Sequence, residues 1–119
     1  MNILLADDEC MALEILTDEV KKLFPDASVD AFADGVPAWE AARQTAYDLV
    51  IIDVFMRKMN GPELAARIHE RSPKTRILFV TGEIESKIEK QGISLESCLF
   101  KPFWTAELKE KTKDLAKDT

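Results

Sequence analysis

The chain has 119 residues, of which 46% are hydrophobic and 32% charged, and its formal net charge is −6. This size and balance predict one globular domain over residues 1–119 and exclude a disordered chain. The acidic balance excludes a bulk binder of nucleic acid or of anionic membranes. The apolar runs, such as Leu49–Ile52, are too short to cross a bilayer, and no signal peptide is evident. Because Cys10 and Cys98 form no metal or disulfide spacing, we expect a reducing, cytoplasmic setting with both thiols as packing residues.

Short apolar runs alternate with longer amphipathic segments along the chain. Apolar or alternating runs predict strands at 1–6, 28–32, 48–54, 76–80 and 97–100. Helical spacing and start and stop signals predict helices at 10–24, about 37–45, from Gly61-Pro62 to Ser72-Pro73, 83–90 and 105–117. Five strand–helix repeats predict an α/β, doubly wound parallel sheet with helices on both faces. In such sheets the ligand site lies beyond the carboxyl ends of the strands.

Polar residues follow four of the predicted strands at this edge. Asp7-Asp8 end the first strand, Asp53 the third, Thr81-Gly82 the fourth and Lys101 the fifth. Each of these groups alone is commonly a helix cap, a turn or a loop residue. Independent turns would not, however, bring all of them to the predicted functional edge of one fold.

The chemistry of this constellation follows from its charges. Carboxylates brought together repel one another unless a cation joins them, and Mg²⁺ favours carboxylate and water ligands while keeping positions open for a phosphate. Lys101 is suited to contact a phosphoryl oxygen, and Gly82 allows close approach to the backbone N–H. Asp53 is a candidate nucleophile, since a carboxylate can become an acyl phosphate. The residues therefore predict a phosphoryl-transfer site.

Four stretches of the chain resemble the CheY-like receiver domain of bacterial two-component response regulators, and together they span nearly its whole length. They are ILLADDE at 3–9, DLVIIDVFMRKMNGPEL at 48–64, ILFVTG at 77–82 and LFKPF at 99–103. The resemblance implies a flavodoxin-like (βα)5 three-layer sandwich with sheet order 2-1-3-4-5. It also implies a phosphoacceptor that catalyses only its own phosphorylation and dephosphorylation and acts as a signalling switch rather than as a turnover enzyme.

The resemblance assigns roles to individual residues. Asp53 would accept phosphate from a phosphohistidine on a sensor histidine kinase or a phosphotransfer protein. Asp8, Asp53 and the backbone carbonyl of Phe55 would ligate Mg²⁺, with Asp7 acting through a bound water. Lys101 would bind the phosphoryl group, Thr81 would swing toward it, and the Lys101–Pro102 bond would be cis.

The chain departs from the family pattern at two places. Arg57 stands where the family usually has proline, which predicts a less rigid and more basic loop beside the acidic site. Cys98 stands where the family usually has the aromatic residue that is coupled to the threonine. Phe100 is the nearest aromatic, and we expect strand alternation to point it to a different face. The sequence therefore lacks the aromatic residue of the usual output switch, whereas the residues for phosphate chemistry are present.

Other functions remain open or are disfavoured by particular residues. A pseudo-receiver that binds partners without phosphorylation, a stand-alone receiver with an unknown output partner, the N-terminal receiver of a DNA-binding regulator, and a phosphorylation-dependent dimer all remain open. A haloacid dehalogenase-type phosphatase needs an aspartate two residues after the nucleophile, where this chain has Phe55. A flavodoxin-like cofactor binder needs a phosphate-cradling loop after the first strand, where this chain has acidic residues.

Overall fold

The computed structural model describes residues 1–83, 85–93, 97–101 and 105–117. Strands and helices alternate along these residues, as the sequence pattern predicted. The strands are β1 (Asn2–Ala6), β2 (Ser28–Phe32), β3 (Leu49–Asp53), β4 (Arg76–Thr81) and β5 (Cys98–Phe100). The helices are α1 (Cys10–Leu23), α2 (Gly35–Ala42), α3 (Gly61–Arg71), α4 (Glu85–Lys90) and α5 (Thr105–Lys117).

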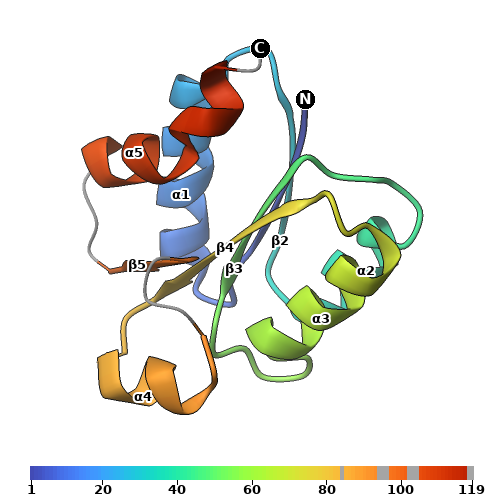
Figure 1. Ribbon diagram of the computed structural model, residues 1–119, viewed down its shortest axis with the longest axis vertical. Helices are drawn as coiled ribbons and strands as arrows, with labels where there is room; N and C mark the ends of the chain where they lie inside the picture. The colour runs from blue at the N-terminus through green and yellow to red at the C-terminus, as the bar shows by residue number, and fades with distance from the viewer. Residues whose placement is uncertain (84, 94–96, 102–104, 118–119) are drawn as a thin grey trace.

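The five strands form one parallel sheet in the order β2-β1-β3-β4-β5. Helices α1 and α5 cover one face of the sheet, and α2 and α3 cover the other (Figure 1). The predicted flavodoxin-like, doubly wound (βα)5 fold is confirmed in its strand order and in its layers. Of the described residues, none belongs to a helix that is both long and apolar enough to cross a membrane.

The two faces of the sheet bury separate apolar clusters because successive side chains of a strand point to opposite sides. One cluster joins Val50 and Ile52 of β3 to the helices α2, α3 and α4. The other joins Leu49 and Ile51 of the same strand to α1 and α5. Every residue of β3 is buried, which explains why its sequence is apolar at consecutive positions.

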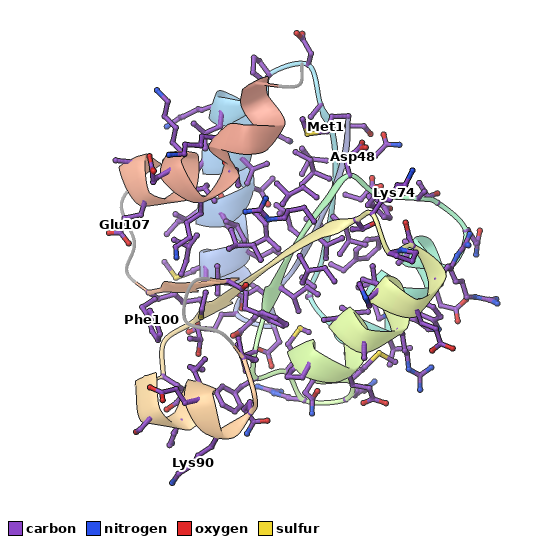
Figure 2. All side chains as sticks on the ribbon, in the orientation of Figure 1. Met1, Asp48, Lys74, Lys90, Phe100 and Glu107 are labelled. Atoms are coloured by element: carbon purple, nitrogen blue, oxygen red, sulfur yellow. The ribbon has the colours of Figure 1, made fainter. Side chains whose placement is uncertain are left out.

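The parallel strands give the sheet an amino edge and a carboxyl edge. Met1, Asp48 and Lys74 lie at the amino edge, whereas Phe100 lies at the opposite end of the sheet (Figure 2). The polar residues that end β1, β3, β4 and β5 therefore gather at the carboxyl edge, where the functional site was predicted.

Two details of the helices differ from the predictions. Helix α2 begins at Gly35 and ends at Ala42 because the Asp34 carboxylate caps its start, accepting from the Val36 N–H at 3.3 Å, and a tight turn follows it. Cys98 is buried as predicted, but the prediction for Cys10 was wrong. Cys10 is the first residue of α1 and is exposed.

The expectation for Phe100 was also wrong. Residues two apart in a strand point to the same face, and Cys98 and Phe100 both pack with the cluster on the side of α2, α3 and α4. Phe100 pairs with Thr81 of the neighbouring strand in the sheet register. The aromatic residue next to Thr81 therefore comes from the position directly before Lys101.

Candidate functional site

Three carboxylates meet at the carboxyl edge of the sheet. Asp7 and Asp8 directly follow β1, and Asp53 is the last residue of the adjacent strand β3. One ligand oxygen from each lies within 4.8 Å of the other two. Asp7 and Asp53 are buried, whereas Asp8 keeps 23% of its side chain exposed. The structure thus brings together the three acidic side chains that the sequence predicted as metal ligands.

Lys101 enters the same cluster from the end of β5. Its ammonium nitrogen lies 2.8 Å from Asp7 Oδ2, 3.7 Å from Asp53 Oδ2 and 3.2 Å from Glu9 Oε2. The backbone fixes this approach, since the Lys101 N–H donates to the Thr81 carbonyl at 2.7 Å. Sequence reasoning gave no role to Glu9, although its position directly after the two aspartates was a usable signal.

The electrostatics of the cluster set the proton affinity of Asp53. Burial, as the larger cause, and the nearby charge of Asp7 together raise the pKa of Asp53 to about 7. Lys101 and the Phe55 N–H oppose this rise because they stabilise the ionised form. Burial alone lowers the pKa of Lys101, but contacts with Asp7, Asp53 and Glu9 outweigh burial and hold that pKa above its ordinary value.

The residues present fit a hard divalent cation. Asp7 Oδ2 is buried and accepts no well-directed hydrogen bond, although it forms the ion pair with Lys101. A buried carboxylate oxygen with an ion pair but no well-directed hydrogen bond has capacity left for a further partner. Carboxylate oxygens are the ligands that Mg²⁺ and Ca²⁺ prefer. A dication among these oxygens would satisfy Asp7 and reduce the repulsion within the cluster.

The other predicted site residues lie around this cluster with different environments. Thr81 is buried, and its hydroxyl accepts a hydrogen bond from the Glu83 N–H at 3.1 Å. Gly82 is exposed, and a Cβ there would meet no atom within 4 Å, so packing does not require glycine at this position. The N–H of Phe55 points to Asp53 Oδ1 at 3.4 Å, while the Phe55 ring is exposed. The predicted cis bond involves Pro102, which lies outside the described residues.

Buried side chains anchor the loop between β3 and α3 to the core. Met56 and Met59 are buried in the apolar cluster under the loop. Asn60 caps α3 by accepting from the Glu63 N–H at 2.9 Å. Gly61 follows, and a Cβ there would lie 2.4 Å from the Asp53 carbonyl oxygen. Only glycine lets the start of α3 approach the end of β3 this closely, a positioning role that sequence reasoning missed.

Comparison with known proteins agrees with this geometry. The model of the response regulator receiver domain family matches residues 3–113. The chain is 32% identical over 117 residues to the sensor protein EvgS of Escherichia coli, covering 97% of this chain and 10% of that protein. It is 26% identical over 121 residues to the transcriptional regulatory protein CutR of Streptomyces coelicolor, covering all of this chain and 55% of that protein.

A solved structure gives the same result for the fold. The chemotaxis protein CheY4 of Vibrio cholerae superposes with a TM-score of 0.78 and 26% identity, covering 95% of this chain and 96% of that one. The chain spans only about a tenth and about half of the lengths of the two curated relatives. A parallel sheet of this order, an acidic cluster with a lysine at its carboxyl edge and a family match over nearly the full length lead to one conclusion: the chain belongs to the response regulator receiver domain family.

Proposed function

We propose that residues 1–119 form a cytoplasmic phosphoacceptor receiver domain that takes a phosphoryl group on Asp53 and signals by changing conformation. The observation that carries the proposal is the meeting of Asp7, Asp8, Asp53 and Lys101 at one edge of the sheet. This arrangement supplies an anionic nucleophile, a set of oxygen ligands for Mg²⁺ and a cation for the transferred group. The domain is a switch with self-catalysed steps and is not a turnover enzyme.

In the proposed reaction, Asp53 attacks the phosphorus atom of a phosphohistidine. A bond forms between a carboxylate oxygen of Asp53 and phosphorus, the nitrogen–phosphorus bond breaks, and the donor imidazole leaves with the electron pair. Asp53 must be ionised to attack, and Lys101 favours this form by lowering the pKa of the carboxyl group. Mg²⁺, held by Asp8, Asp53 and the Phe55 carbonyl with Asp7 acting through water, would neutralise charge on the phosphoryl oxygens.

Lys101 and Thr81 complete the proposed site. The Lys101 ammonium already lies 3.7 Å from Asp53 Oδ2, so it can pair with a phosphoryl oxygen attached there. The Thr81 hydroxyl would exchange its bond with the Glu83 N–H for one to the phosphoryl group. Gly82 leaves the backbone beside that group uncovered. Thr81 ends β4 and Gly82 follows it, so movement of these two residues would reach the segment leading to α4.

The experiment that tests the proposal is intact-mass analysis after addition of acetyl phosphate, with and without Mg²⁺. Wild type should gain one phosphate in a Mg²⁺-dependent manner, and Asp53→Asn should gain none. Asp8→Asn keeps the nucleophile and should lose the Mg²⁺ dependence together with most of the adduct. A folded wild-type protein that gains no phosphate would overturn the proposal and favour a partner-binding pseudo-receiver.

The proposed donor is a sensor histidine kinase or a phosphotransfer protein that docks on α1. Met11 and Ile15 of this helix are 77% and 59% exposed, and they lie on one helix face at spacing i, i+4. The other exposed large apolar side chains among the described residues are Val36 and Phe55, which also belong to segments that follow strands at the carboxyl edge. An apolar rim around an acidic site is suited to a helical partner that carries a phosphohistidine.

This docking proposal predicts that variants on α1 slow phosphotransfer from a protein donor but not from acetyl phosphate. Met11→Glu and Ile15→Glu should slow phosphotransfer from a phosphohistidine protein by about tenfold or more, since losing a buried apolar anchor costs about 1–3 kcal/mol. The same variants should react with acetyl phosphate at the wild-type rate. Leu16, which is buried beside Ile15, must stay unchanged so that folding is preserved. Equal slowing with both donors would contradict a docking role.

A further inference from the structure

The three carboxylates of the site pair with two cations from different parts of the chain. Lys101 pairs with Asp7 and Asp53. Asp8 is paired instead with Arg57 of the loop between β3 and α3, whose Nε lies 3.9 Å from Asp8 Oδ2. Among the described residues, no cation other than Arg57 forms an ion pair with Asp8. The metal-free site therefore holds a counter-ion on each of its carboxylates.

Arg57 reaches Asp8 from the solvent. Its side chain is 92% exposed, whereas that of Asp8 is 23% exposed. Met56 and Met59, on either side of Arg57 in the loop, are buried and hold the backbone in place. The guanidinium can therefore leave Asp8 by side-chain rotation alone, with no change in the core.

A pocket beside the Arg57–Asp8 ion pair can hold the guanidinium once it leaves Asp8. It has a volume of about 220 Å³ and is lined by Asp8, Ala33, Asp34, Arg57 and Lys58. Asp34 provides a second carboxylate in this pocket. The two basic side chains therefore share a polar pocket with one carboxylate of the acidic cluster and one carboxylate outside it.

We propose that Arg57 is the counter-ion of Asp8 in the metal-free protein and that a divalent cation must displace it, so that Arg57 sets the metal affinity of the site. A dication and a guanidinium compete for the same carboxylate oxygens, because both need them at short range. When the metal is bound, Arg57 is released toward Asp34 or toward an acidic group of a partner. The inference rests on the proposed function, since it assumes that Asp8 is a metal ligand.

The test is a calorimetric titration of the non-phosphorylated protein with MgCl₂, comparing Arg57→Gln with Lys58→Gln. Both changes remove one positive charge from an exposed side chain lining the same pocket, but the structure pairs only Arg57 with Asp8. Ion pairs near the surface are worth up to about 1 kcal/mol, which corresponds to about fivefold in affinity. Arg57→Gln should therefore bind Mg²⁺ about threefold to fivefold more tightly than wild type, and Lys58→Gln less than twofold more tightly. The difference between the variants should shrink at about 0.5 M salt.

The outcomes separate this inference from the proposed function. Equal affinities of Arg57→Gln and Lys58→Gln would overturn the direct role of Arg57 and leave the metal site intact. Absence of saturable Mg²⁺ binding in the folded wild type would overturn the Mg²⁺ site itself. As a second readout, the ¹H–¹⁵N signal of Arg57 Nε should shift as Mg²⁺ saturates the site. A signal that stays unchanged through saturation would contradict displacement.

Discussion

The ionised form of Asp53 should destabilise the metal-free protein, so that Asp53→Asn is more stable than wild type at neutral pH. The pKa of an aspartate in an unfolded chain is about 3.9, whereas burial and Asp7 raise that of Asp53 to about 7 in the folded protein. Between these values the folded state binds the proton that the unfolded state has released. The stability contributed by the protonated carboxyl is therefore present below pH 4 and is lost as the pH rises to about 7.

The magnitude follows from the same two pKa values. A difference of about three units, at 1.36 kcal/mol each, gives an upper limit of about 4 kcal/mol. The attraction of Lys101 is already contained in that pKa, and relaxation around the ionised group reduces the cost further, so we expect about 1–3 kcal/mol. For a domain of this size, this raises the melting temperature of Asp53→Asn by about 3–12 °C relative to wild type.

The assay is urea unfolding followed by circular dichroism between pH 5 and 8, with EDTA present. The advantage of Asp53→Asn over wild type should grow across this range and level off above pH 7. Asp26→Asn, which changes an exposed carboxylate between α1 and β2, serves as the control and should show no such trend. Added Mg²⁺ should stabilise wild type but not Asp53→Asn, because a ligand stabilises only the state that binds it. A wild-type protein as stable as Asp53→Asn at pH 8 without metal would refute the reasoning.

Two further predictions concern the loop that follows Asp53. Gly61→Ala should lower the free energy of unfolding by about 1–3 kcal/mol and slow adduct formation on Asp53, because the new Cβ would lie 2.4 Å from the Asp53 carbonyl oxygen. Urea unfolding and intact mass measure the two effects, and Gly82→Ala, whose Cβ meets nothing within 4 Å, should keep its stability. Phe55→Ala should release phosphate from Asp53 several-fold faster than wild type, since the exposed ring would partly shield the acyl phosphate from water. Equal rates of phosphate loss, followed by intact mass after removal of the donor, would reject the shielding role.

The architecture could be predicted because the apolar runs, the helical spacing and the strand–helix alternation all indicated the same fold. The consecutive apolar residues from Leu49 to Ile52 specify a strand buried on both faces, and that strand lies at the centre of the sheet. The end of α2 was misplaced because no glycine or proline marks its stop near Ala42, where a tight turn made by backbone hydrogen bonds ends the helix. Such turns leave little trace in the composition.

The site was predictable as a set of side chains, but not as a set of contacts. Asp7, Asp8, Asp53 and Lys101 could be brought together because parallel strands align their carboxyl ends. The ion pair between Arg57 and Asp8 could not be predicted, since it depends on how the loop after β3 turns. The expectation that Phe100 points to a different face was wrong because Cys98 and Phe100 are two residues apart in a strand and therefore share a face.

The loop after β3 carries buried side chains, which the core restricts, and exposed side chains, which the core leaves free to change. Met56 and Met59 are buried, and a change at either would disturb the core beneath Asp53. Phe55, Arg57 and Lys58 are exposed. Substitutions at the outward positions can therefore leave the frame that holds Asp53 intact, and under the proposals above they would alter metal affinity and the choice of partner. Duplicated copies of such a domain can therefore diverge in their signalling partners while the residues of the acidic site stay in place.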